Sequence, residues 1–318
     1  MNGLLGGALV NHLTAARRSL ACAVACAAIL LLPSVAPGVI IDTVTGIGNT
    51  SAPSDDPGWA NVGTVGIGSA VYLGNRWAVT ASHVWAGSTT FSGTTYQIVP
   101  GSETLLTNNG ALGRTQFTDL VLYQLATDPG LPAVTIAAST PAVGSAVTMI
   151  GAGRNRGAFT TWSVNTSTSP YTWTVSGSNV NAAGYLWDSS RTMRWGTNRL
   201  DAAANWIASD SKSAYVVETQ FTYSPAYSTE AHASAGDSGG AVFFKNGSRW
   251  ELAGIMLAVD AYSGQPGNTA VFGNQTYSAD LSFYRSQIVQ VVPEPSSLGL
   301  VALGAIVLAA RGRRCWRQ

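Results

Sequence analysis

Short apolar runs separated by turn residues dominate the chain between about residues 60 and 290. The runs at 69–73 and 76–80 flank Gly74-Asn75, a pair typical of a tight hairpin turn. Comparable strand patterns cover residues 62–67, 95–99, 120–125, 145–150, 215–223, 241–244 and 249–258. Only residues 281–291 have a helical pattern. Two blocks of short strands and one terminal helix predict an all-β fold of two packed β-barrels, at about 60–135 and 140–290.

The N-terminal end has the pattern of a signal peptide. Arg17-Arg18 precedes a short apolar run at residues 20–32, and small residues follow. The run is short for a membrane span. A buried core helix is the alternative, which the arginine pair disfavours. We therefore interpret residues 1–38 as a signal peptide that is cleaved after Ala36 or Gly38.

The C-terminal end combines a proline-flanked acid, an apolar segment and a basic cluster. Pro293-Glu294-Pro295 precedes an apolar run at 298–310, and four arginines follow, namely Arg311, Arg313, Arg314 and Arg317. Residues 292–318 resemble the PEP-CTERM sorting signal of exopolysaccharide-producing Gram-negative bacteria. The resemblance implies export, transient membrane association through a transmembrane-like helix, and processing by an exosortase-type enzyme. A plain tail anchor is the alternative, and both interpretations place the middle of the chain outside the cytoplasm.

Composition excludes several classes of protein. Charged residues make up 10% of the 318 residues, against a usual share of about 25%, and the formal net charge is +1. No basic block lies outside the chain end, which disfavours a nucleic-acid partner. Cys22, Cys26 and Cys315 all lie near the chain ends, and His83 and His232 are the only histidines of the middle segment. We therefore expect no disulfide and no thiolate or histidine-rich metal site there. The chemistry of the motifs described next requires no metal and no organic cofactor.

Three motifs bring together the residue types of nucleophilic catalysis. His83 follows an apolar strand, Asp119 precedes Leu-Val-Leu, and Ser238 lies in Gly-Asp-Ser-Gly-Gly. A serine hydroxyl needs an adjacent base, and histidine is the side chain that titrates near neutrality. A carboxylate fixes the histidine tautomer and stabilises the imidazolium. In this order, over roughly residues 60–290, the motifs resemble those of the chymotrypsin-like (trypsin-like) serine proteases.

The resemblance implies both a fold and an activity. The fold would be two packed six-stranded β-barrels with a short C-terminal helix, within a protease domain at residues 39–291. His83 would act as general base and then acid, Asp119 would orient it, and Ser238 would attack the carbonyl. The N–H groups of Gly236 and Ser238 would form the oxyanion hole. The expected activity is that of a secreted or surface-attached serine endopeptidase, whose partners are protein or peptide substrates.

Two departures from the family concern the substrate pocket, which we place at His232, Leu257, Ala258 and Val259. The family often has Asp six residues before the nucleophile, whereas this chain has His232. Cleavage after Lys or Arg is therefore disfavoured, and apolar or small residues are expected before the scissile bond. The other three residues stand where the family usually has Ser-Trp-Gly. His232 is the only other candidate base, and we interpret it as a polar loop or pocket residue.

The resemblance also implies an activation pair. In the family, a new amino terminus inserts beside the Asp that precedes the nucleophile. Cleavage after Gly38 would free the amino group of Val39 to pair with Asp237. The competing explanation is an Asp237 held by internal hydrogen bonds.

Residues 154–214 are longer than a plain connection and rich in Trp. They form either ordinary core and loop packing or a surface that contacts a substrate or a glycan. Two rival functions stay open. The altered residues Leu257, Ala258 and Val259 favour a catalytically weak binding protein on a protease fold. The sorting signal and the Trp-rich segment favour a structural component of an exopolysaccharide matrix.

Overall fold

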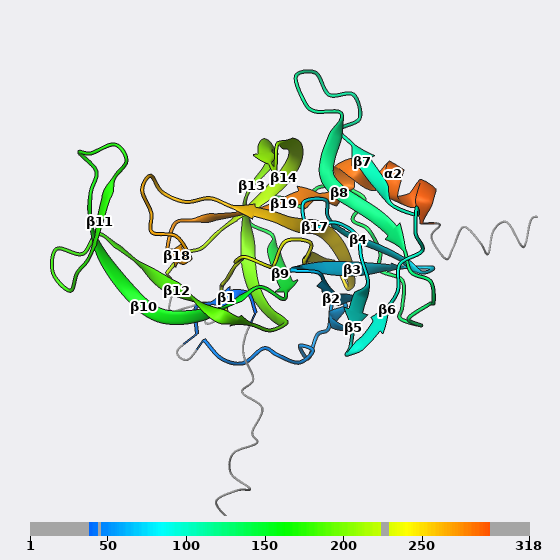
Figure 1. Cartoon of the computed structure of the whole chain (residues 1–318), viewed down its shortest axis with the longest axis horizontal. Coiled ribbons are helices and arrows are strands. Elements are labelled where there is room, and N and C mark those ends of the chain that lie inside the picture. The colour runs from blue at the N-terminus through cyan, green and yellow to red at the C-terminus, as the bar shows by residue number, and fades with distance from the viewer. Residues whose placement is uncertain (1–37, 44–45, 224–228, 293–318) are drawn as a thin grey trace, which may run out of the picture. The chain divides into compact units, whose positions relative to one another are not determined.

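The computed structural model describes residues 38–43, 46–223 and 229–292 (Figure 1). About half of these residues lie in antiparallel strands, which confirms the all-β prediction. The strands are β1 (Ile40–Ile41), β2 (Val62–Val65), β3 (Gly68–Gly74), β4 (Trp77–Ala81), β5 (Thr89–Phe91), β6 (Thr94–Tyr96), β7 (Thr104–Thr107), β8 (Phe117–Gln124), β9 (Ala146–Gly151), β10 (Arg154–Asn165), β11 (Thr172–Val175), β12 (Ala182–Arg191), β13 (Arg194–Ser209), β14 (Lys212–Gln220), β15 (Ala231–His232), β16 (Ala241–Asn246), β17 (Arg249–Val259), β18 (Thr269–Val271) and β19 (Gln275–Asp280). A 3-10 turn, η1 (Trp59–Asn61), and the predicted terminal helix, α2 (Leu281–Val291), accompany them.

The first sheet has the order β6-β5-β2-β3-β4-β8-β7. It contains the predicted hairpin, but the turn lies one residue later than expected: Gly74 pairs with Trp77, and Asn75 and Arg76 form the turn with positive φ. The sheet has seven strands where six were expected, and β5 and β6 form a short hairpin at one of its ends. Its order does not close as a full ladder. An isolated antiparallel bridge between Ile98 and Leu125 joins the segment after β6 to the end of β8 instead.

The second sheet is a closed six-stranded barrel in the order β13-β14-β19-β17-β16-β9, as expected for the second block. The largest core cluster contains buried residues of both sheets, including Leu120 of β8 and Ile255 of β17. Helix α2 adds Tyr284, whose hydroxyl accepts hydrogen bonds from Thr118 Oγ1 (3.0 Å) and from the backbone of Tyr215 (2.9 Å). The two sheets therefore pack against each other and against α2.

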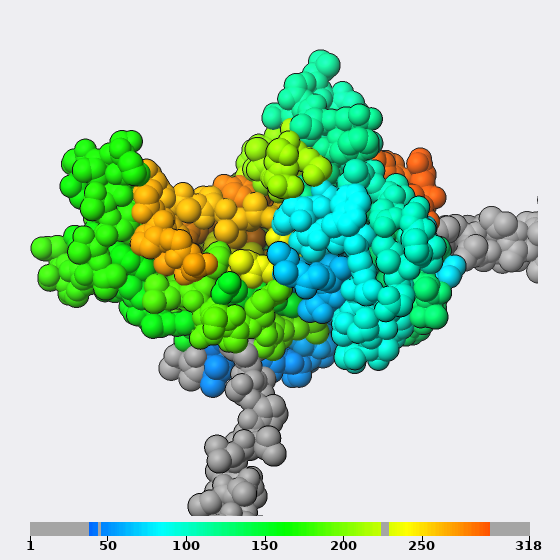
Figure 2. Space-filling model, in the orientation of Figure 1, coloured from blue at the N-terminus to red at the C-terminus, as the bar shows by residue number. Residues whose placement is uncertain are grey.

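The Trp-rich segment 154–214 is folded into long strands. Together with β18, the strands β10, β11 and β12 form a four-stranded sheet in the order β11-β10-β12-β18. This sheet, drawn mainly in green, extends away from the closed barrel in Figures 1 and 2. Its aromatic residues pack on one another, as Trp162 (1% exposed) does edge-on against Trp173 at 5.9 Å between ring centroids. Packing is therefore one role of these tryptophans.

The predicted targeting segments lie almost entirely outside the described residues. This holds for the signal peptide at 1–38, of which only Gly38 is described, and for the sorting signal at 292–318, of which only Val292 is described. Within 38–43, 46–223 and 229–292, no helix is both long enough and apolar enough to span a membrane. The predicted transmembrane-like helix at 298–310 is outside these ranges.

Candidate active site

Two neighbouring strands of the first sheet bring His83 and Asp119 together. His83 follows β4, Asp119 lies near the start of β8, and Ala81 pairs with Leu120 in the ladder between them. Nδ1 of His83 lies 2.7 Å from Oδ2 of Asp119, and the His83 backbone N–H donates to Oδ1 at 2.9 Å. The Asp119 side chain is fully buried, whereas that of His83 is 26% exposed. The imidazole is thus held at one nitrogen and accessible on its other side.

Two hydroxyl groups complete the surroundings of Asp119. Ser82 Oγ donates to Oδ1 at 2.8 Å, and Ser209 Oγ donates to Oδ2 at 2.6 Å. Burial raises the pKa of Asp119, but the hydrogen bonds from His83 and Ser209 outweigh it and keep the pKa below the ordinary 3.8. The hydrogen bond to Asp119 raises the pKa of His83 above its ordinary 6.5, against the effect of burial. The carboxylate therefore stays ionised and stabilises the imidazolium.

Ser238 lies in a tight turn between Gly236 (φ 101°) and Gly239 (φ 87°). A side chain at Gly239 would collide with the carbonyl oxygen of Ser69, so only glycine fits there. The Ser238 carbonyl accepts from Ser69 N at 2.8 Å, which ties the turn to the first sheet. The Ser238 hydroxyl points to the carbonyl oxygen of Leu257 at 3.5 Å. Among the described residues it makes no hydrogen bond to His83.

The backbone around Gly236 is suited to binding an anion. Among residues 38–43, 46–223 and 229–292, the N–H groups of Gly236 and Ser238 donate to no backbone acceptor. The carboxylate of Asp237, which lies between them, is buried and accepts from Gly153 N at 2.7 Å, Ser234 N at 2.8 Å and Ser234 Oγ at 2.9 Å. Burial raises the pKa of Asp237 to about 6, against these hydrogen bonds.

A pocket of about 220 Å³ adjoins Ser238. Leu257, Ala258 and Val259 line it as the sequence predicts. The other lining residues are Trp187, Ala233, Ser234, Ala235, Ser238 and Met256. The walls are therefore largely apolar, and none of the lining side chains carries a charge.

His232 does not line this pocket, so its predicted place there is corrected. It pairs with Ile40 in the β1-β15 ladder, is 1% exposed, and stacks on Phe221 with the ring centroids 5.3 Å apart. Its Nδ1 faces Thr276 Oγ1 at 3.0 Å. Burial lowers the pKa of His232 to about 3, which keeps the imidazole neutral. His232 therefore lies in β15, beside β1, and its side chain packs among aromatic residues. Its spacing from Ser238 in the sequence does not predict this position.

Val39 is buried just before β1 and is joined to Gly38 by a peptide bond. In this unprocessed chain it has no amino group that could pair with Asp237. The Val39–Asp237 pair therefore stays a prediction for a chain that begins at Val39.

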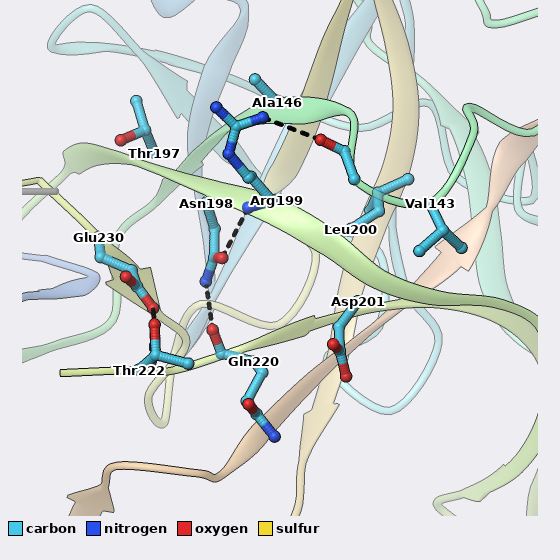
Figure 3. A pocket seen from close by; sticks show the side chains of 11 residues that line it. Val143, Ala146, Thr197, Asn198, Arg199, Leu200, Asp201, Gln220, Thr222 and Glu230 are labelled. Carbon is cyan, nitrogen blue, oxygen red and sulfur yellow. Dashed lines mark hydrogen bonds between the residues drawn. The ribbon is translucent and has the colours of Figure 1, made fainter. Parts of the chain in front are cut away.

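A larger pocket of about 390 Å³ lies elsewhere on the second barrel and contains none of His83, Asp119 and Ser238 (Figure 3). Its polar groups are bonded within the protein, as Arg199 Nη1 is to Gly144 O at 2.9 Å and Thr222 Oγ1 is to Glu230 at 2.6 Å. Pocket size alone thus does not locate the catalytic chemistry. In the described part of the chain, no group of three or more His, Cys, Asp or Glu is arranged to hold a metal ion.

Three residues of segment 154–214 reach the site although the motif analysis does not identify them. Trp187 lines the pocket, Ser209 binds Asp119, and Arg191 Nη2 donates to Gly236 O at 3.2 Å. Each reaches the site only through long-range strand pairing. No local sequence signal marks them, apart from the unusual length of the segment.

Comparison with family models matches residues 68–255 to the trypsin-like peptidase domain and residues 291–314 to the PEP-CTERM protein-sorting motif. No curated protein matches. Similar solved structures include a mutant of human heparin binding protein, with 13% identity, 78% of this chain and 97% of that chain covered, and a TM-score of 0.49. Rv3671c from M. tuberculosis in an inactive form has 13% identity, coverage of 82% and 99%, and a TM-score of 0.44. Neuropsin, a mouse brain serine protease, has 17% identity, coverage of 77% and 98%, and a TM-score of 0.45.

The peptidase model covers more than half of the 318 residues, including the segments around His83, Asp119 and Ser238. The chain therefore belongs to the trypsin-like peptidase family, has its chymotrypsin-like fold, and carries a PEP-CTERM sorting motif at its C-terminal end.

Proposed function

We propose that this chain is an exported or surface-attached serine endopeptidase of a Gram-negative bacterium, with Ser238 as its nucleophile. One observation carries the proposal: the fully buried side chain of Asp119 holds His83 at Nδ1, so that Nε2 is the nitrogen available to act as a base. A carboxylate at Nδ1 selects the tautomer that has its lone pair on Nε2. That nitrogen is the base that a serine nucleophile requires.

The chemistry proceeds in two stages. In the first, His83 Nε2 takes the proton of Ser238 as Oγ attacks the substrate carbonyl, and then gives it to the leaving amine. In the second, His83 activates a water molecule that hydrolyses the acyl-enzyme. The N–H groups of Gly236 and Ser238 supply the hydrogen bonds that the carbonyl oxygen gains as it becomes negative. Asp119 stays ionised and stabilises the imidazolium in both stages.

The Ser238 hydroxyl must first rotate from Leu257 toward His83. The 3.5 Å contact that this rotation gives up is at the limit of a hydrogen bond. Catalytic hydrogen bonds are often loose before substrate binds, so the observed orientation is compatible with the mechanism.

The pocket beside Ser238 indicates the class of substrate, and the C-terminal sorting motif indicates where the protein acts. A pocket of about 220 Å³ with walls that include Leu257 and Val259 suits an apolar or small side chain before the scissile bond. The sorting motif supports export, and we propose removal of residues 1–38, a protease domain at 39–291, and processing of 292–318 by an exosortase-type enzyme. Membrane association through the tail would then be transient.

Covalent labelling tests the proposal. The wild-type protein should react with a fluorophosphonate probe and hydrolyse a peptide library, whereas Ser238→Ala should not label and should lose several orders of magnitude in kcat. Ser248→Ala, in the exposed turn between β16 and β17, is the matched control and should behave as the wild type. Undiminished hydrolysis by Ser238→Ala would falsify the assignment of the nucleophile.

The second candidate is a catalytically weak protein that binds peptides on the same fold. The hydrogen bond of Ser238 Oγ to Leu257, in place of one to His83, favours it. A wild-type protein that binds peptides with apolar residues but does not label would establish this alternative.

A further inference from the structure

Arg191 closes a ring of hydrogen bonds around the carbonyl group of Gly236. Its Nη2 donates to Gly236 O at 3.2 Å and its Nε donates to Ala152 O at 3.0 Å. On the other side of the ring, Ala152 N donates to Ser69 Oγ at 3.0 Å, and Ser69 Oγ donates to Gly236 O at 2.9 Å. The Gly236 carbonyl thus has two donors, one from the first sheet and one from the end of β12.

These bonds fix the peptide plane between Gly236 and Asp237 at both of its polar groups. The carbonyl is held by Arg191 and Ser69, and the N–H of Asp237 donates to Ser234 O at 3.0 Å. Glycine has no Cβ to restrict its backbone, and Gly236 adopts φ 101°, so contacts with neighbouring groups must select this conformation. The N–H groups of Gly236 and Ser238 lie directly before and after the fixed plane. Fixing the Gly236–Asp237 peptide plane therefore helps to set the directions of the N–H groups of Gly236 and Ser238.

The guanidinium group is well suited to this task. Its planar fork can donate to two acceptors at once, and a charged donor makes a stronger hydrogen bond than a neutral one. It lies so close to Gly236 that a side chain added at this glycine would collide with it. Arg191 belongs to none of the pocket walls near Ser238. Its loss should therefore disturb the loop without removing a contact to the substrate side chain.

We propose that Arg191 is a positioning residue, which holds residues 234–238 in the shape that presents two N–H groups to the oxyanion. This inference rests on the proposed function, since the oxyanion arises only in the cleavage reaction. The residue acts through Gly236 and does not touch the substrate.

Kinetic comparison of variants tests the proposal. Arg191→Met should lower kcat about tenfold or more, with KM within about twofold of the wild type, because only transition-state stabilisation is lost. Arg191→Lys should recover part of kcat, since one ammonium group can reach only one of the two acceptors. The matched control is Arg154→Met, which removes the residue opposite Arg191 in the β10-β12 ladder. Unchanged kcat in Arg191→Met, or an equal loss in Arg154→Met, would overturn the proposal.

Hydrogen exchange supplies a readout that does not depend on activity. In full-length Ser238→Ala protein, the added Arg191→Met substitution should speed amide exchange in residues 235–239 about tenfold, while exchange in β16 and β17 stays unchanged. Equal exchange with and without Arg191 overturns the role of Arg191, whatever the wild type does with the fluorophosphonate. Faster exchange in a protein that does not label would support the role of Arg191 in holding the loop and reject only the protease proposal.

Discussion

Ser209 Oγ lies 2.6 Å from Oδ2 of Asp119, the same oxygen that faces His83 Nδ1. Ser209 is the last residue of β13 and is buried, whereas His83 and Asp119 belong to the first sheet. A strand of the second barrel thus supplies a donor to the buried carboxylate. The first sheet therefore supplies both members of the candidate catalytic pair, and the second barrel supplies a hydrogen bond that supports it.

The first prediction is that Ser209→Ala lowers kcat/KM about tenfold. A hydrogen bond to a charged group contributes about 1.5–3 kcal/mol, and part of that contribution is lost when the hydroxyl is removed. Asp119 then carries a less compensated charge, which should raise the pKa of His83 further and move the acid limb of the pH profile upward. The measurement is kcat/KM against pH. Ser211→Ala, in the exposed β13-β14 turn, is the control and should change neither quantity.

The second prediction concerns the wild-type pH profile. His83 must be neutral to act as a base, and its pKa is raised above 6.5 chiefly by the hydrogen bond to Asp119. Activity should therefore rise with pH through a midpoint above 6.5 and be lost below it. Asp119→Asn should remove this shift and reduce kcat by about 10⁴-fold, since the wrong tautomer is then held. A wild-type profile that is flat between pH 5 and 8, with chemistry rate-limiting, would contradict a histidine base.

The three candidate catalytic residues can be predicted from short motifs because each of them lies in a distinctive local sequence. An apolar strand precedes His83, another follows Asp119, and glycines surround Ser238. Helix α2 can also be predicted from the sequence, since its residues form one amphipathic segment and prolines follow it at 293 and 295. In these places local pattern and tertiary structure agree.

The residues that segment 154–214 supplies to the candidate site cannot be predicted from short motifs. Strand β10 is rich in Ser, Thr and Asn, and the pairings of β10 with β12 and of β13 with β14 include register shifts. The alternation of apolar and polar residues along these strands is therefore weak. Arg191 and Ser209 reach the candidate site because of how these strands pair. Strand pairing between residues far apart in the sequence is not visible in the residues next to Arg191 or Ser209. His232 shows the reverse case. Its spacing from Ser238 indicated the pocket, but β1 pairs with β15 and buries it.

The third prediction tests the pocket through Trp187→Ala. Removing the indole from the pocket of about 220 Å³ should enlarge it and shift preference toward larger apolar side chains before the scissile bond, by about tenfold in relative kcat/KM. A peptide library with varied residues at that position measures the shift. Trp173→Ala, in β11 and outside the pocket walls, is the control. A wild-type profile dominated by Arg and Lys would contradict the apolar pocket.

The fourth prediction concerns the amino terminus and Asp237. The Asp237 carboxylate already accepts three hydrogen bonds, from Gly153 N, Ser234 N and Ser234 Oγ, in a chain whose Val39 nitrogen is part of a peptide bond. These donors do not depend on a free amine. We therefore expect proteins that begin at Gly38 and at Val39 to have kcat values within about twofold of each other.

An activation pair of Val39 and Asp237 predicts the opposite result, namely a large difference in kcat between these two proteins. Breaking one side of a buried ion pair costs about 3–5 kcal/mol, so a protein with one residue before Val39 would lose more than about 100-fold in kcat. N-terminal sequencing of the exported protein and kinetics of both forms distinguish the two explanations. Strong activity confined to the form that begins at Val39 would establish the activation pair and show that internal hydrogen bonds do not hold the loop alone. Equal activity of both forms, with labelling of Ser238 in each, would show that the three hydrogen bonds to Asp237 are sufficient.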